Sequence, residues 1–479
     1  MRPLRSPWTT AALLGAAATL PYLLPLAGKW RLLDAAQLRQ SFVVPFRGQP
    51  RARPWERVRR QPVEPVAGPV QPQGQASPAQ PAPARPVPAP SRPPAALPVD
   101  PAPADLLNCP QGALAHFHES LARTARGEGL TRIAHFGDSV VTGDLITGEV
   151  RARLQQAYGD GGPGWIYPQR PWEWYGRLGL NLKGKGWRLH SPVLTGRPDR
   201  RYGLAGIAFT GGPGAETVLS TAQPFDTVEL HCLAQPRTGR LQVQVDRGSP
   251  VDLRTEPGAG ITVIRVSAAA ARHLTVRGDA LLYGLVLERQ GAGVVVDPLG
   301  QNGYAIQHLA RIEPQHWIEA LRLRRPDLVV LAFGTNEVGY YNIPGPAYAA
   351  DYREVVRRVR EALPSASILV MGPMDRGERS AEGRLGTMPN LIRIVEAQKR
   401  IAAELGLAFF DSYRAMGGEG SAVRGYQQTP RLMTGDFTHP TRTGADRLAR
   451  SLVDALILKH QAWQAAQAPA PASAHDTPR

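Results

Sequence analysis

Cysteine is nearly absent from this chain, which has only Cys109 and Cys232 among its 479 residues. The two do not form a C-x-x-C pair, which excludes a zinc or redox motif of that kind, and the sequence leaves open whether they form a disulfide or remain separate thiols. Aromatic residues reach only 7%. With 43% hydrophobic and 20% charged residues, the chain can bury a core, and this composition excludes a disordered protein, a coiled coil and a polytopic membrane protein.

Acidic residues are scarce relative to basic ones, 40 against 56, so the formal net charge is +16. A nucleic-acid-binding surface would need this excess on the folded part of the chain. Residues 1–100 instead hold 13 basic and 4 acidic residues, while the rest of the chain holds 43 and 36. We interpret the excess as the basic flank of a membrane segment, and we expect no nucleic-acid partner.

An uncharged run from Ser6 to Gly28 is long enough to span a bilayer. We expect residues 1–30 to be a membrane anchor or a secretory signal peptide, with a buried amino-terminal helix as the third interpretation. Pro25 stands where cleavage after Ala27 would need a small residue, which favours the uncleaved anchor.

The segment that follows, residues 31–104, is Arg-rich and then Pro-rich, with 15 Pro between Gln61 and Pro103. This composition predicts an extended linker, and residues 463–479 are expected to be a disordered tail of the same character. Together these segments predict a periplasmic protein tethered to the inner membrane, or a secreted one if the amino terminus is cleaved.

Apolar, β-branched-rich runs alternate with helical patterns over residues 105–160 and 291–462. The runs cover residues 131–136, 293–297, 328–333, 367–371 and 407–411. The helical patterns cover residues 144–158, 306–323, 348–363, 391–405 and 443–459. This alternation predicts a five-stranded parallel sheet with helices on both faces, a three-layer α/β/α domain. Residues 161–290 interrupt it with period-2 runs, which predict an inserted all-β domain, either a sandwich or a jelly roll.

Residues that can carry chemistry follow directly after three of the predicted strands. Ser139 comes after the first, Gly303 after the second and Asn336 after the third. Ligand sites in parallel sheets lie beyond the carboxyl ends of the strands, so these residues are expected to lie close together. Near the carboxyl end, Asp436 and His439 are spaced so that both can converge on one serine, with the carboxylate orienting the imidazole.

These four blocks, Gly-Asp-Ser, a glycine after the second strand, Gly-x-Asn and Asp-x-x-His, resemble those of the SGNH or GDSL-type hydrolases. The resemblance implies a flavodoxin-like fold in which Ser139 is the nucleophile, His439 the general base and Asp436 its orienting partner. It also implies an oxyanion hole made of the Ser139 N–H, the Gly303 N–H and the Asn336 side chain. Val140 and Glu337 depart from the residues commonest in the family, and neither belongs to the triad.

A narrower resemblance covers more of the chain. The sequence HFGDSVVTGDLITGEVRARLQQAYGDGGPGW, a β-rich insert and then GTNE are similar to exported bacterial peptidoglycan O-acetylesterases, which carry a carbohydrate-binding-module-like insert. The resemblance implies a serine esterase that needs no cofactor or metal and removes O-acetyl groups from a polysaccharide, in the first place peptidoglycan. An O-acetyltransferase, a deacetylase of an exopolysaccharide such as cellulose, and a non-catalytic polysaccharide-binding scaffold remain alternatives.

Aromatic residues cluster between Trp165 and Tyr175, which is dense for a chain so poor in them. They suggest either a platform on which a sugar stacks or packing between the insert and the catalytic domain. The possible substrate contacts are Asp138, Trp165, Trp172, Trp174, Tyr340 and Tyr341.

Overall fold

The computed structural model describes residues 105–234, 239–255, 257–258, 260–340, 342–380 and 382–467. The anchor and linker expected over residues 1–104 lie outside these ranges, as does most of the expected tail. Within these ranges, no helix combines the length and the apolar character needed to cross a bilayer. The last helix, α12 (Arg442–Gln467), extends into the segment expected to be a tail.

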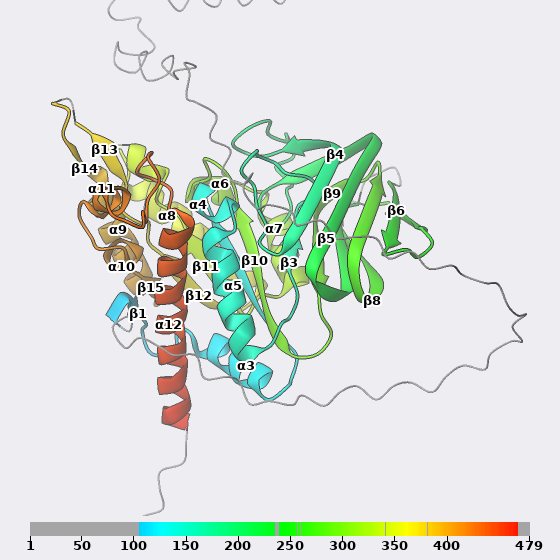
Figure 1. Ribbon diagram of the computed structural model, residues 1–479, viewed down its shortest axis with the longest axis horizontal. Helices are drawn as coiled ribbons and strands as arrows, with labels where there is room; N and C mark the ends of the chain where they lie inside the picture. Colours follow the sequence, from blue (N-terminus) through cyan, green and yellow to red (C-terminus); the bar gives the residue numbers. More distant parts are fainter. Residues whose placement is uncertain are drawn as a thin grey trace, which may run out of the picture. The chain divides into compact units, whose positions relative to one another are not determined.

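The predicted five-stranded parallel sheet is confirmed (Figure 1). All neighbouring strands run parallel, in the order β15-β12-β11-β2-β10. Their bounds are Leu130–Gly137 for β2, Gly293–Gly300 for β10, Leu328–Ala332 for β11, Ser367–Met371 for β12 and Ala408–Phe410 for β15. A sixth strand, β1 (Leu107–Asn108), pairs antiparallel with β15 at the edge. Its two residues are too few to show a pattern in the sequence.

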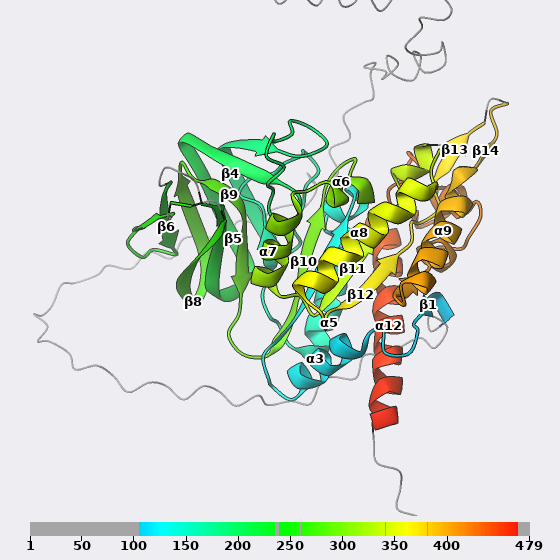
Figure 2. The same ribbon diagram turned by 180° about the vertical axis from the view of Figure 1, so that it is seen from behind.

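Helices cover both faces of this sheet, which confirms the three-layer arrangement. Figure 1 shows α5 (Leu145–Tyr158) and α12 in front of it, and Figure 2 shows α8 (Pro346–Ala362) and α9 (Asn390–Glu404) on the opposite face. The face of α5 and α12 also carries α3 (Ala115–Ala125). Alternate residues of β11 separate accordingly: Val330 packs with α5 and α12, whereas Val329 and Leu331 pack with α8 and α9.

The prediction of one continuous helix over residues 306–323 is wrong. Residues 306–323 form two helices, α6 (Ile306–Ala310) and α7 (Pro314–Arg324), and the break falls just before Pro314. The Glu313 carboxylate starts the second helix by accepting from the His316 N–H at 2.7 Å. A proline has no N–H to continue the first helix and disfavours helical geometry in the residue before it, so the chain has to restart.

The inserted segment is all-β, as expected. Seven strands lie between α5 and β10 in the order β3-β9-β5-β8-β6-β7, with β4 also paired to β5. They are β3 (Gly164–Ile166), β4 (Leu180–His190), β5 (Ala208–Leu233), β6 (Arg240–Val245), β7 (Val251–Arg254), β8 (Ile261–Gly278) and β9 (Leu281–Glu288). Adjacent strands are antiparallel except β5 and β9. The sequence GGPG at residues 211–214, which has the composition of a turn, lies inside the long strand β5.

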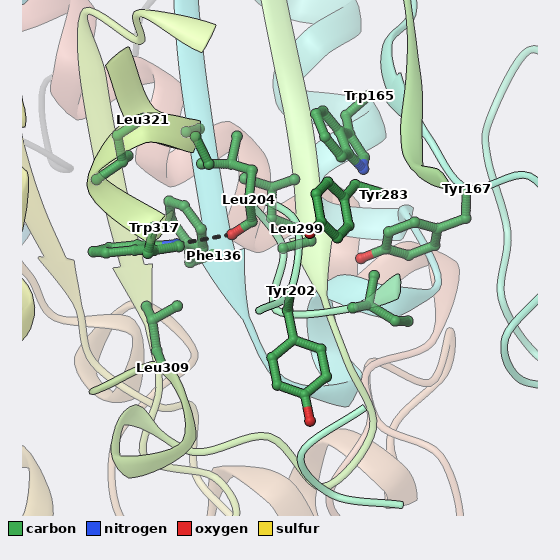
Figure 3. Packing of buried hydrophobic residues seen from close by; sticks show 14 of the residues in the cluster. Phe136, Trp165, Tyr167, Tyr202, Leu204, Tyr283, Leu299, Leu309, Trp317 and Leu321 are labelled. Atoms are coloured by element: carbon green, nitrogen blue, oxygen red, sulfur yellow. Dashed lines mark hydrogen bonds between the residues drawn. The ribbon is translucent and has the colours of Figure 1, made fainter. Parts of the chain in front are cut away.

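The two sheets share one hydrophobic core. Figure 3 shows Phe136 of the parallel sheet against Trp317 of α7, in the same cluster as Trp165 and Tyr283 of the antiparallel sheet. The ring centroids of Phe136 and Trp317 lie 5.7 Å apart. The Trp317 indole donates to the Leu204 carbonyl at 3.0 Å, which satisfies its buried N–H. The insert is therefore packed into the body of the protein rather than joined by a tether.

A buried ion pair ties the sheets together at the same place. The Arg324 guanidinium contacts Asp297 of β10 and Glu288 of β9, each at 2.6 Å. Asp297 also accepts from the Trp165 N–H of β3 at 2.8 Å. Burial works against the charged forms, but the two carboxylates raise the pKa of Arg324, and Arg324 helps to lower the pKa of Glu288 to about 2. Arg324 and Glu288 are therefore both charged at neutral pH.

Candidate active site

Ser139 lies where β2 ends and the short helix α4 (Ser139–Thr142) begins. The turn before it needs Gly137, because a Cβ there would lie 2.5 Å from Val141 Cγ2 and 2.9 Å from the Ala332 carbonyl. Asp138 caps α4 by accepting from the Val140 N–H at 2.9 Å. The Gly-Asp-Ser sequence therefore makes a tight turn that presents the serine at the carboxyl edge of the parallel sheet.

His439 and Asp436 reach this serine from the loop before α12. Ser139 Oγ lies 2.9 Å from His439 Nε2, and His439 Nδ1 lies 2.6 Å from Asp436 Oδ2. The other carboxylate oxygen, Oδ1, accepts from the backbone N–H groups of Thr438 and His439, both at 3.0 Å. Because Oδ1 is fixed in this way, Oδ2 is directed at the imidazole, and the serine, the histidine and the aspartate form one hydrogen-bonded chain.

The charges in this chain suit proton transfer. The hydrogen bond with Asp436 raises the pKa of His439 above its ordinary 6.5, while burial and the Arg376 charge oppose the shift. Burial alone would raise the pKa of Asp436, but the hydrogen bonds from His439, Thr434 and the backbone lower it well below its usual range. Asp436 is therefore ionised whenever His439 is in a position to accept a proton.

The two other predicted oxyanion residues lie on the loops after β10 and β11. Gly303 has φ +67, and the position that a Cβ would occupy is open. The Asn336 amide donates to the Tyr304 carbonyl at 2.8 Å. An amide nitrogen carries two hydrogens, so a second donor remains for another acceptor. Ser139, Gly303 and Asn336 thus sit at the ends of three neighbouring parallel strands.

Of the predicted substrate contacts, Trp174 lines the same cavity as the serine. Its side chain is 58% exposed and lines a cavity of about 500 Å³ together with Ser139, Asp436 and His439. The indole N–H donates to Asn302 Oδ1 at 2.9 Å, one residue before Gly303. The loop of Trp174 is anchored by the Leu178 N–H, which donates to Asp144 Oδ2 at 2.9 Å.

The other predicted contacts differ in position. Asp138 and Trp165 are each 1% exposed, so both expectations are corrected: Asp138 is a helix cap and Trp165 is a core residue. Trp172 is partly buried against the core. Tyr340 is 58% exposed, with its carbonyl accepting from Asn390 at 2.9 Å. Tyr341 lies outside the described residues.

Two polar residues near the site were not among the predicted site residues. Arg376 follows β12 and donates to the Thr335 carbonyl at 2.6 Å. Its positive charge acts to lower the pKa of both His439 and Asp138, against larger effects that raise them. Arg376 could have been identified from the sequence, because it follows the carboxyl end of the fourth predicted strand. Glu337 was noted only as a departure from the family pattern, and it is buried next to Asn336. In the described part of the chain, no group of three or more His, Cys, Asp or Glu is placed to hold a metal ion.

Comparison with family models and curated proteins gives one match. The model of the GDSL-like Lipase/Acylhydrolase family matches residues 266–447. The match begins within β8, so it includes Gly303, Asn336 and His439 and omits Ser139. Among curated proteins, the sequence finds no significant match.

Comparison with solved structures covers more of the chain. A peptidoglycan O-acetylesterase is 25% identical, with a TM-score of 0.65, over 74% of this chain and 99% of that one. An acetyl xylan esterase is 17% identical over 34% of this chain and 80% of its own, with a TM-score of 0.26. A family two carbohydrate esterase from Clostridium thermocellum is 12% identical over 59% of this chain and 100% of its own, also with a TM-score of 0.26. The last two scores are too low to support any argument.

Proposed function

We propose that the chain acts as a GDSL-type serine hydrolase of the SGNH class and removes O-acetyl groups from a cell-envelope polysaccharide, in the first place peptidoglycan. The observation that carries this proposal is the hydrogen-bonded chain from Ser139 through His439 to Asp436, open to a cavity of about 500 Å³. A serine in this arrangement is activated as a nucleophile toward an ester carbonyl.

In the proposed mechanism, Ser139 Oγ attacks the acetyl carbonyl while His439 Nε2 accepts its proton. The oxyanion that forms is held by the Ser139 N–H, the Gly303 N–H and the Asn336 amide. His439 then returns the proton to the departing sugar hydroxyl, which leaves an acetyl group on Ser139. Water, activated by the same imidazole, releases acetate and restores the enzyme.

The polysaccharide part of the proposal is supported by the cavity wall. Trp174, Leu145, Val140 and Pro440 give the cavity that contains the nucleophile an apolar lining. The exposed indole of Trp174 offers a flat face, and sugar rings have apolar faces that stack on such surfaces. The solved peptidoglycan O-acetylesterase aligns over nearly its whole length, and we extend its substrate class to this chain on that basis.

We also propose that the enzyme acts outside the cytoplasm, tethered by residues 1–30. This proposal rests on the uncharged run of 23 residues from Ser6 to Gly28 and on the Pro-rich linker after it. Such a linker would let the catalytic body reach a polymer that lies away from the membrane.

The proposed function is tested by acetate release from O-acetylated peptidoglycan and from a panel of acetylated polymers, cellulose included. We expect the wild type to release acetate from peptidoglycan fastest, and Ser139→Ala to lower the rate by roughly 10⁴-fold or more. Retained hydrolysis in Ser139→Ala would contradict the mechanism. Transfer of acetyl to an added sugar without free acetate would show a transferase, and binding without either reaction would show a scaffold.

A further inference from the structure

Glu337 is a buried carboxyl group that the proposed mechanism does not use. It is 1% exposed and directly follows Asn336 in the chain. Its Oε1 accepts from the Ile306 N–H at 3.1 Å, and its Oε2 accepts from the Gly334 N–H at 3.0 Å. The first donor is at the start of α6, directly after the Gly303 loop, and the second lies on the loop after β11.

Both loops carry a proposed oxyanion donor. Ile306 is three residues after Gly303, and Gly334 is two residues before Asn336. A second tie joins the same loops, because the Asn336 amide donates to the Tyr304 carbonyl at 2.8 Å. The relative position of the Gly303 N–H and the Asn336 amide is therefore set by two cross-links, and Glu337 supplies the charged one. Hydrogen bonds to charged groups are the stronger kind.

We propose that Glu337 is a positioning residue of the oxyanion hole, whose carboxylate clamps the Gly303 loop to the Asn336 loop. The proposal rests on the proposed acyl-transfer function, since it concerns the donors for that oxyanion. Such donors stabilise a transition state only when they are held in place before the charge develops. The clamp provides this rigidity without touching the substrate.

The Asn336 loop is held from two sides, and Glu337 makes a contact on the side of the Gly303 loop. Gly334 has φ +125, and a Cβ there would lie 2.9 Å from Pro373, so this backbone is closely packed from the other side. The buried Gln398 amide fixes the neighbouring Phe333 carbonyl at 2.8 Å. The Asn336 loop is thus held to α9 by Gln398 and to the Gly303 loop by Glu337.

The charge state of Glu337 gives the clamp a pH dependence. Burial raises the pKa of Glu337 to about 7, against the hydrogen bond from Ile306, and the Asp138 charge adds to the increase. The titratable groups that face it are Asp138 and the hydroxyls of Tyr348 and Tyr352. A protonated carboxyl group accepts less well than a carboxylate, so the clamp weakens as the pH falls through this value.

The test is Glu337→Gln, which keeps the shape but places an amide N–H₂ against one of the two backbone donors. We expect kcat for p-nitrophenyl acetate to fall by about 10–100-fold. This decrease is no larger than the one expected when a whole oxyanion donor is removed. KM is expected to change little, whereas the free energy of unfolding should fall, because one buried backbone N–H loses its acceptor. The matched control is Glu404→Gln, at the far end of α9, where the carboxylate is half-exposed and paired with Arg353, and it should retain wild-type kcat.

A double-mutant cycle with Asn336→Ala separates positioning from general stability. If Glu337 acts through the oxyanion loops, Glu337→Gln will cost much less in the Asn336→Ala background than alone. Glu337→Asp keeps the charge, so its kcat should lie above that of Glu337→Gln. In addition, log kcat/KM of the wild type should fall more steeply below pH 7 than that of Glu337→Gln, in which only His439 titrates.

Unchanged kcat in a folded Glu337→Gln, or additive losses in the cycle, would overturn the proposal. If Glu337→Gln does not fold, the proposal is judged by Glu337→Asp in the same cycle, where a loss of kcat that is fully additive with that of Asn336→Ala would overturn it. The rate at which a fluorophosphonate labels Ser139 measures the reactivity of this serine without any ester substrate. If the wild type is labelled normally yet releases no acetate from any polymer, the proposed function is contradicted, but the positioning role of Glu337 is not.

Discussion

The parallel and the antiparallel sheets of this protein share one core, yet they contribute very differently to the proposed active site. Ser139, Gly303 and Asn336 all follow strands of the parallel sheet. The antiparallel sheet contributes Trp174, and only through the loop between β3 and β4. In a parallel sheet every strand ends at the same edge, so residues far apart in the sequence converge there. Antiparallel strands end at alternate edges, so the insert adds packing and one cavity wall.

The comparison predicts that changes at the parallel edge affect the chemical step most. Asn336→Ala removes one of three proposed oxyanion donors, and we expect kcat to fall by about 10²–10³-fold with little change in KM. Steady-state kinetics with an acetyl ester would measure both constants. A loss confined to KM would assign Asn336 to substrate binding instead.

Changes at the junction of the sheets should affect stability instead of chemistry. Arg324→Met leaves Asp297 without the buried partner that it has in the wild type, and removing one member of a buried ion pair costs about 3–5 kcal/mol. We expect the free energy of unfolding to fall by that amount in urea titrations, while kcat per folded molecule stays the same. A loss of kcat with unchanged stability would mean that the junction acts on the site.

The proton-transfer chain at the parallel edge predicts a pH dependence. His439 accepts the serine proton only when neutral, and Asp436 holds the pKa of His439 above 6.5. From the protonation of His439 alone we therefore expect kcat/KM to fall by up to about tenfold per pH unit below that pKa. Asp436→Asn should lower the plateau and shift the His439 limb to lower pH. An unshifted limb would show that Asp436 does not set the pKa of this histidine.

The smallest effect is expected from the insert. Trp174→Ala removes a stacking face but no reacting group, so we expect KM for an acetylated polymer to rise by up to about tenfold while kcat for p-nitrophenyl acetate changes less than twofold. The control is Leu194→Ala, because Leu194 lies on the same insert and is 58% exposed, and this change should leave both constants unchanged. Trp187→Ala is not a suitable control, because Trp187 is buried. An equal loss on both substrates would give Trp174 a role in the chemistry.

The same contrast explains what the sequence could predict. The parallel strands are continuous apolar runs followed by Gly, Ser and Asn, so their positions and the residues at their ends were predictable from local pattern. The first half of β5 was not, because GGPG has the composition of a turn and is held in the sheet by pairing with distant strands. The burial of Trp165 likewise depends on neighbours more than a hundred residues away along the chain.

Two charged residues show the same limit. Arg324 lies in a basic run that the sequence could not distinguish from an exposed helix end, although the fold places it against Asp297 and Glu288. Glu337 differs from the commoner family residue by one methylene, and its link to Ile306 becomes visible only when the two loops are seen together. Contacts that join separate loops leave no pattern in a single segment of sequence.

Acid quenching followed by mass spectrometry of the peptide that contains Ser139 would detect the proposed acetyl-serine intermediate itself. During turnover of an acetyl ester, we predict an acetyl group on Ser139 of the wild type that disappears as substrate is exhausted, and neither the adduct nor acetate release in Ser139→Ala. Acetate release that continues in Ser139→Ala, or an acetyl adduct on another residue that forms and decays at the turnover rate, would contradict the account.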